Sequence, residues 1–98
     1  MTTPRDLILI ASLDDHWRPA RIEPLPVGWP TMLRRLIEDE SSWVALIQRR
    51  AGAPMPKRGD IMLTRAVIRS LRAIDARVAD HLIIAPMGRF SFRAAGLL

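Results

Sequence analysis

The feature that most constrains the fold is an almost uninterrupted apolar run at residues 41–48, SSWVALIQ. A run of this length with so few polar side chains predicts a central β-strand that is covered on both faces. A proline-broken loop follows, and then an amphipathic helix is predicted from Asp60 to about Ile74. The apolar stripe of this helix has members at helical spacing, namely Leu63, Val67, Ile68, Leu71 and Ile74. A buried strand that leads into such a helix indicates an α/β fold.

The other segments supply the remaining strands and one more helix. Apolar runs, alternation of apolar and polar residues, and turn residues predict strands at 6–13, 18–25, 77–85 and 90–92 and a short helix at 31–40. The prolines of the second strand indicate an edge of the sheet, and Pro30 stands where a helix commonly begins. The resulting order, β-β-α-β-α-β-β, predicts an α/β sandwich with a mixed sheet.

Length and composition bound the class of protein. The 98 residues suffice for one core, so residues 1–98 are predicted to form a single domain. The sequence contains no cysteine, which excludes disulfides, thiolate nucleophiles and cysteine-based zinc sites. No apolar run approaches the roughly 20 residues that span a bilayer, and the N-terminus lacks the pattern of a signal peptide. We therefore expect a cytoplasmic protein without a membrane partner.

The basic side chains are almost all guanidinium groups. Lys and Arg number 15 against 10 Asp and Glu, which gives a net charge of +5, and Lys57 is the only lysine. Guanidinium suits bidentate contacts to phosphate or carboxylate, although a GC-rich genome also favours arginine over lysine. The candidate binding residues are arginines on one face of the second predicted helix and tryptophans in predicted turns: Arg65, Arg69, Arg72, Trp17 and Trp29.

Several stretches resemble, in the same order, the C-terminal domain of RadC proteins. They are SLDDHWRPARIEPL, LRRLIEDESSWVALI, AGAPMPKRGDIMLTRAVIRSL and ARVADHLIIAPMGRFSFRAAGLL, and the likeness is most specific after residue 52. RadC domains belong to the JAB/MPN (JAMM) group of zinc-dependent hydrolase folds. The resemblance therefore implies a cytidine-deaminase-like layered sandwich, and the family name suggests DNA repair. The helix–hairpin–helix region that precedes the domain in full RadC proteins is not expected in residues 1–98.

The resemblance also implies a degenerate zinc site. In the family, a strand like WVALIQRR ends in His-x-His, and the third ligand is an Asp that follows eleven residues after the second His. With Asp60 as that ligand, the two histidine positions fall on Ile47 and Arg49. The family's Ser, which is associated with stabilising the reacting oxygen, falls on Lys57, and its catalytic Glu falls near Asp6.

These replacements predict that no zinc is bound and that no other cofactor takes its place. Side chains 47 and 49 leave the same face of a strand, but Ile47 has no lone pair, and Arg49 is positively charged and has no acceptor atom. His16 and His81 have no spacing that supports another metal site. We expect His16 to be a solvated turn residue and His81 to be satisfied by Asp80 or by neighbouring backbone.

The sequence allows two compatible roles for Asp60. Its carboxylate can pair with Arg49, so that the guanidinium takes the place of the missing metal. Alternatively, Asp60 only caps the helix that begins there, and Arg49 points into water.

The predicted function is that of a non-catalytic RadC-like JAMM domain, a pseudo-metalloprotease, that acts as a binding or scaffold module. Its partner is expected to be another protein or a second copy of itself, met through an edge strand or an exposed tryptophan. One alternative is an accessory protein that binds nucleic acid weakly and without sequence specificity. A second alternative is a residual metal-dependent hydrolase.

Overall fold

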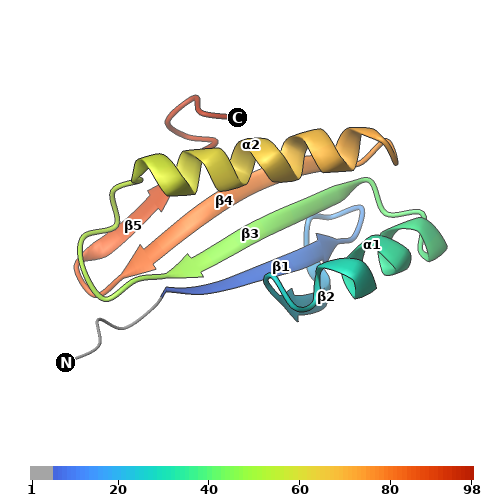
Figure 1. Cartoon of the computed structure of the whole chain (residues 1–98), viewed down its shortest axis with the longest axis horizontal. Coiled ribbons are helices and arrows are strands. Elements are labelled where there is room, and N and C mark those ends of the chain that lie inside the picture. The colour runs from blue at the N-terminus through green and yellow to red at the C-terminus, as the bar shows by residue number, and fades with distance from the viewer. Residues whose placement is uncertain (1–5) are drawn as a thin grey trace.

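The computed structural model describes residues 6–98, which form one mixed five-stranded sheet and two helices (Figure 1). In chain order the strands are β1 (Leu7–Leu13), β2 (Pro19–Pro24), β3 (Trp43–Arg49), β4 (Arg77–Ala85) and β5 (Gly88–Ser91). The helices are α1 (Trp29–Glu38) and α2 (Arg58–Arg72). The α/β class, the mixed sheet and the order of elements predicted from the sequence are confirmed.

The sheet has the strand order β2-β1-β3-β4-β5, with β3 in the centre and β2 at an edge, as predicted. β3 and β4 are parallel, whereas the other neighbouring strands pair antiparallel. Parallel neighbours need a crossover connection, and α2 supplies it. Because α2 is the crossover, its first turn lies beyond the end of β3, and this arrangement positions the site described below.

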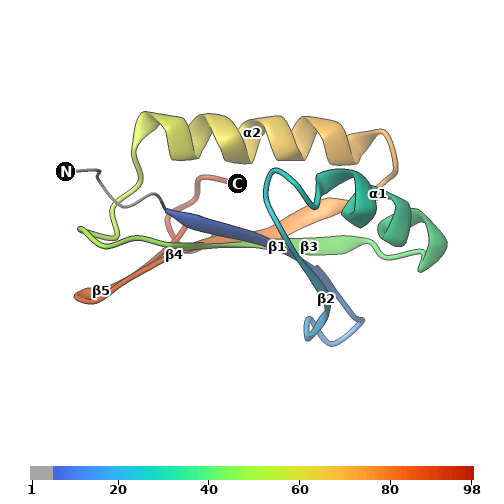
Figure 2. The same ribbon diagram turned by 60° about the horizontal axis from the view of Figure 1, so that its bottom comes forward.

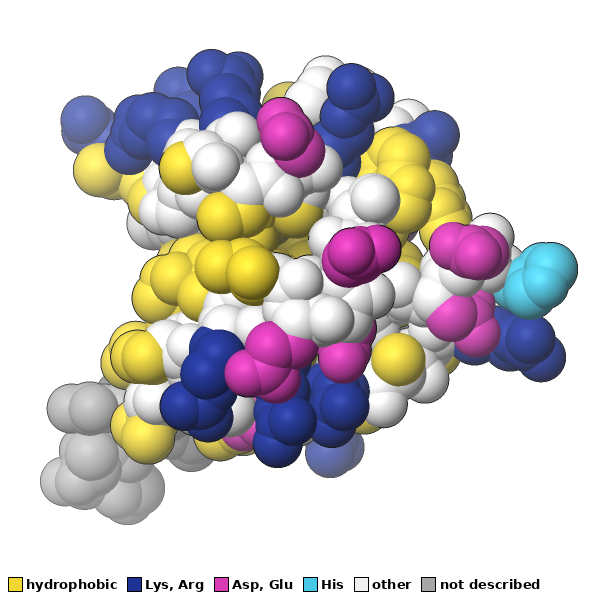
Figure 3. Space-filling view, turned by 90° about the vertical axis from the view of Figure 1, so that its right-hand side faces the viewer, with side chains coloured by type: hydrophobic (Ala, Val, Ile, Leu, Met, Phe, Trp, Pro, Cys, Tyr) yellow, Lys and Arg dark blue, Asp and Glu magenta, His cyan; other side chains and the backbone are white. Residues whose placement is uncertain are grey.

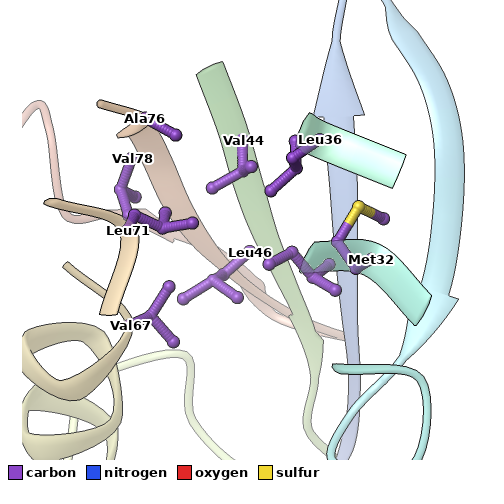
Figure 4. Close-up of a cluster of buried hydrophobic side chains, with 9 residues drawn as sticks. Met32, Leu36, Val44, Leu46, Val67, Leu71, Ala76 and Val78 are labelled. Atoms are coloured by element: carbon purple, nitrogen blue, oxygen red, sulfur yellow. The ribbon is translucent and has the colours of Figure 1, made fainter. Parts of the chain in front are cut away.

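Both helices lie on the same face of the sheet (Figure 2). Between them and the sheet lies the main core, to which α1 contributes Met32 and Leu36, α2 contributes Val67 and Leu71, and the sheet contributes Ile10, Val44, Leu46 and Val78 (Figure 4). Full burial of such a side chain contributes about 1.5–3 kcal/mol. The apolar stripes read from the sequence therefore hold the two helices against the sheet.

The helices begin and end close to the predicted positions. α1 has Pro30 in its first turn, as expected from the preference of proline for that position. α2 begins at Arg58, two residues before the predicted start, so that Asp60 lies in its first turn. Neither helix within residues 6–98 is long and apolar enough to cross a bilayer.

The opposite face of the sheet carries no helix within the described part of the chain (Figure 2). A small apolar cluster around Ala11, Leu13 and Ala79 lies on this face. Trp17 packs on Trp43 beside it, with 5.2 Å between the ring centroids. The central strand was expected to be covered on both faces. Within the described residues a helix covers only one face of β3, so that expectation is wrong, and the other face is shielded only in part, by neighbouring side chains.

Candidate functional site

A buried polar network lies at the edge of the sheet where β3 ends. Asp6 precedes β1, Gln48 lies at the end of β3, Arg50 directly follows that strand, and Asp60 comes from the first turn of α2. β1 runs antiparallel to β3, with Leu7 opposite Arg49, so the start of one strand meets the end of the other. The topology thus brings together side chains that are far apart in the sequence.

Strand geometry decides which residues at the end of β3 enter the network. Successive side chains of a strand point to opposite faces of the sheet. Gln48 follows Val44 and Leu46 onto the helix-covered face, where it is 1% exposed, and Arg50 continues on the same side with 8% exposed. Ile47 packs against the small cluster on the open face, and Arg49 is exposed.

Arg50 is the centre of the network. Its Nη2 donates to both carboxylate oxygens of Asp60, at 2.8 Å and 2.7 Å, and its Nε donates to Asp6 Oδ2 at 2.9 Å. Nη1 donates to the main-chain oxygen of Met55, at 2.9 Å, in the loop between β3 and α2. Burial by itself would lower the pKa of Arg50, but the hydrogen bonds to Asp60 and Asp6 outweigh it and raise the pKa above its ordinary value. The guanidinium therefore stays charged.

Each carboxylate oxygen of Asp60 accepts two hydrogen bonds. Its Oδ1 accepts from Gln48 Nε2 at 3.0 Å, and its Oδ2 accepts from the main-chain N–H of Lys57 at 2.7 Å, in addition to the two bonds from Arg50. The bond to Lys57 is the helix cap expected of an acid in the first turn. Burial would raise the pKa of Asp60, but the hydrogen bonds from Arg50, Lys57 and Gln48 outweigh it and hold the pKa below 3.8.

Gln48 links the charged residues to a buried histidine. Its Nε2 donates to Asp6 Oδ2 at 2.7 Å as well as to Asp60, so its Oε1 faces His81 Nε2 at 2.8 Å. This orientation requires a proton on His81 Nε2, because an amide oxygen can only accept. Nδ1 of the neutral ring is then an acceptor, and the hydroxyl of Thr64 lies within hydrogen-bond distance both of Nδ1 and of the main-chain oxygen of Asp60.

His81 is fully buried in β4 and stacks on Phe92, with 4.3 Å between the ring centroids. Burial lowers the pKa of the His81 imidazole from 6.5 to about 4, although the nearby carboxylates of Asp60 and Asp80 act in the opposite direction. The ring is therefore neutral at neutral pH. The sequence suggested Asp80 or neighbouring backbone as the partner of the ring. Both suggestions are wrong for the ring, whose nitrogens face the side chains of Gln48 and Thr64, and Asp80 accepts instead from the main-chain N–H of His81 at 2.7 Å.

The sequence prediction for the partner of Asp60 is also wrong by one residue. Ile47 and Arg49 do not face Asp60, whose partner is Arg50, ten residues earlier in the chain. Counting back eleven residues pointed to Arg49, whereas the side chains from this end of β3 that face Asp60 are Gln48 and Arg50. The idea that a guanidinium pairs with Asp60 holds, and so does the capping role, since Asp60 performs both.

One signal in the sequence could have identified the residues that were missed. Gln48 is the only amide in the apolar run at 41–48, on the same side of the strand as Val44 and Leu46. A buried amide needs hydrogen-bond partners. Asp6 was placed near the site from the sequence, and the structure brings it there. Lys57 contributes its main-chain N–H, while its side chain is exposed.

The residues at the network do not fit a zinc ion. A catalytic zinc has about three protein ligands, whereas Asp6 and Asp60 both accept hydrogen bonds from Arg50, and the side chain between them is the amide of Gln48. No group of three or more His, Cys, Asp or Glu side chains that could hold a metal occurs within residues 6–98.

The other candidate residues lie away from the network. Arg65, Arg69 and Arg72 are exposed on α2. Trp17 is 40% exposed and lies beneath the guanidinium of Arg93, whose central carbon is 5.0 Å from the ring centroid. Trp29 is partly buried and packs against the main core. His16 is exposed in the turn after β1, as predicted.

The chain is similar to proteins of one family. The RadC-like JAB domain matches residues 14–97. A UPF0758 protein of Albidiferax ferrireducens is 34% identical over 104 residues, covering 97% of this chain and 44% of that protein. A UPF0758 protein of Rhodobacter capsulatus is 30% identical over 95 residues, covering 96% of this chain and 44% of that protein. The chain thus spans less than half the length of these relatives.

Proposed function

Because the chain belongs to the RadC-like JAB domain family, we propose that it is a member that neither binds zinc nor hydrolyses a peptide or isopeptide bond. In this proposal it acts as a binding or scaffold module in the cytoplasm.

The observation that carries the proposal is the position of Arg50. Its guanidinium lies between Asp6 and Asp60 and donates to both. A divalent cation at this place would be repelled by Arg50 and would have to displace these charge-assisted hydrogen bonds, which are stronger than neutral ones. Asp60 also has no free carboxylate oxygen, since each accepts two hydrogen bonds.

The network supports a structural role for the residues that remain. Arg50 holds the main-chain oxygen of Met55 in the middle of the β3–α2 loop, and Asp60 holds the main-chain N–H of Lys57 at its end. The charged pair therefore orders this loop and fixes α2 over the end of β3. In a hydrolase the same edge would have to admit a substrate and a water molecule.

Metal content and hydrolysis test the proposal together. The protein, purified without chelator and then offered zinc, should retain no stoichiometric metal by elemental analysis after desalting. It should cleave neither a peptide nor an isopeptide substrate. About one equivalent of zinc per chain, removable by a chelator with loss of a cleavage activity, would refute the proposal.

A second candidate function, non-specific binding of nucleic acid, is favoured by the arginines of α2. Arg65, Arg69 and Arg72 are exposed, and none of them takes part in an ion pair found within residues 6–98. Side chains of this kind suit phosphate contacts. A role linked to DNA repair would rest on this activity and on the family name. Filter retention of DNA over a range of salt concentrations tests it.

A further inference from the structure

The two helices are separated by an apolar groove of about 360 Å³. One wall is formed by Leu25, Pro26 and Trp29, from the turn before α1 and its first residue, and the other by Leu63, Ala66 and Ser70 of α2. Figure 3 shows the hollow, with hydrophobic side chains between the part of the surface that belongs to α2 and the part below it. No charged side chain lines it within the described residues.

The rim of the groove on the α2 side is positively charged. Counting by the helix repeat from Ala66, Met62 and Arg69 are the neighbours on the exposed side of α2, and Arg65 lies further round the helix, beside Met62 and Arg69. Met62 is 58% exposed. Figure 3 shows Lys and Arg side chains gathered over α2 beside the hydrophobic hollow. The rim thus combines an exposed thioether with guanidinium groups.

These arginines differ from those of α1 in their charge environment. Arg34 and Arg35 on α1 lie 3.8 Å and 3.6 Å from carboxylate oxygens of Glu38. No ion pair found within residues 6–98 involves Arg65 or Arg69. The positive charge on the α2 rim is therefore available to an outside carboxylate.

We propose that the groove between α1 and α2 binds an acidic amphipathic helix of a partner protein. The apolar side chains of that helix fill the groove, and its carboxylates contact Arg65 and Arg69. This is the helix-in-groove mode of recognition, with bidentate arginine–carboxylate contacts that fix its orientation. The inference rests on the proposed function as a binding module and names the chemistry of its partner.

A second copy of the chain does not supply such a helix from its described residues. The only acid within α1 is Glu38, which is next to two arginines, and the only acid within α2 is Asp60, which is buried. A nucleic acid would engage the arginines but has no aliphatic surface to fill the groove. The chemistry of the groove therefore favours a different protein.

A synthetic helical peptide tests the proposal by fluorescence anisotropy at physiological salt. The probe carries leucines at i, i+4 and i+7 with glutamates on either side of this stripe. Two control peptides are a scrambled sequence without an apolar face and a version in which lysines replace the glutamates. A single-stranded oligonucleotide serves as a polyanion control. We expect binding of the acidic amphipathic peptide only.

A matched pair of variants locates the binding site. Arg65→Glu with Arg69→Glu should lower the affinity for the peptide by at least about tenfold, because two charge-assisted contacts are replaced by repulsion between carboxylates. Arg49→Glu with Arg89→Glu changes the net charge by the same amount at exposed positions away from the groove, and we expect a change of about twofold or less. Ala66→Glu, which places a carboxylate in the apolar groove, should also abolish binding. Circular dichroism verifies that each variant is folded.

Each outcome decides the question. Absence of peptide binding, equal weakening by both charge reversals, or binding of the oligonucleotide alone through Arg65 and Arg69 would overturn the proposal. The metal test is independent of the groove. If the protein binds the peptide but also binds zinc and hydrolyses a substrate, only the proposed lack of activity is contradicted. If it is free of metal and binds no peptide, only the proposed binding of a helix in the groove is contradicted.

Discussion

Arg50 holds Asp60 through a single nitrogen, since Nη2 lies 2.8 Å from Oδ1 and 2.7 Å from Oδ2. This geometry leaves Nε for Asp6 and Nη1 for the main chain of Met55. One buried guanidinium therefore joins the start of β1, the β3–α2 loop and the first turn of α2.

Loss of Arg50 should destabilise the protein strongly. Arg50→Met leaves Asp6 and Asp60 without their cationic partner in a site where the Arg50 side chain is 6% exposed. Removal of one partner of a buried ion pair costs about 3–5 kcal/mol, and urea unfolding measures this cost. Arg49→Met is the matched control, because Arg49 is exposed, and its effect should stay within about 0.5 kcal/mol. Equal effects of the two substitutions would show that the network is not the cause.

A double-mutant cycle should show that Arg50 and Asp60 are coupled. Asp60→Asn preserves the capping acceptor for Lys57 and removes the charge, so capping alone predicts a small loss of stability. With Arg50→Met as the second substitution, the coupling free energy should be about 1–3 kcal/mol. A coupling within about 0.3 kcal/mol of zero would leave Asp60 with its capping role only.

Imidazoles placed at the two positions that face Asp60 should create zinc affinity. Gln48→His with Arg50→His places two nitrogen donors on the helix-covered side of β3, facing Asp60, and removes the guanidinium that repels the metal. Isothermal titration with zinc should show about one site per chain. Ile47→His with Arg49→His is the control, since these side chains lie on the open face. Zinc binding by the control instead would mean that the register of the site described here is wrong.

Stability should fall as the pH decreases from about 6.5 to about 4, because of His81. Burial lowers the pKa of His81 from 6.5 to about 4 in the folded protein. Between these values the unfolded chain binds the proton more readily than the folded one, so the free energy of unfolding decreases as the pH falls. The full effect amounts to about 3 kcal/mol. Urea unfolding at a series of pH values measures it.

NMR gives the direct check on His81. In a His16→Gln variant only one imidazole remains, and its ring proton shifts should not change until the pH falls well below 6.5. A midpoint near 6.5 in the folded protein would contradict the buried neutral ring.

Binding of nucleic acid, if it occurs, should be weak, non-specific and strongly dependent on salt. The exposed arginines of α2 can contact phosphates, but no element of the described chain presents a set of side chains that reads base edges. Retention of a DNA duplex should be lost between low and physiological salt. Selective retention of one sequence at physiological salt would show that the arginines have a more specific role.

Much of the fold was predictable because its signals are local. The stripe of α2, the run that became β3 and the alternation along β2 each depend on neighbours within a few residues. The strand at Arg77–Ala85 was predicted with its observed bounds. Coverage of β3 was not predictable in this way, because whether a helix lies on a face depends on the path of the whole chain.

The site was harder to predict because it depends on register. A shift of one residue along a strand moves a side chain to the other face, and that shift separates Arg49 from Arg50. Pairing of Asp60 with a guanidinium was one of two roles that the sequence left open, and the length of the β3–α2 connection decides which arginine pairs with it. The links from Gln48 to His81 and Thr64 join three separate elements, and no local pattern indicates them.

The edges of the sheet restrict how this protein can meet other chains. β2 begins and ends with proline, which has no N–H to donate to a further strand, and β5 has four residues. Strand addition needs a longer run of free main-chain groups. Within residues 6–98, neither edge strand is therefore well suited to growth of the sheet into fibrils, and we expect a partner to engage side chains on a face of the domain instead of an edge strand.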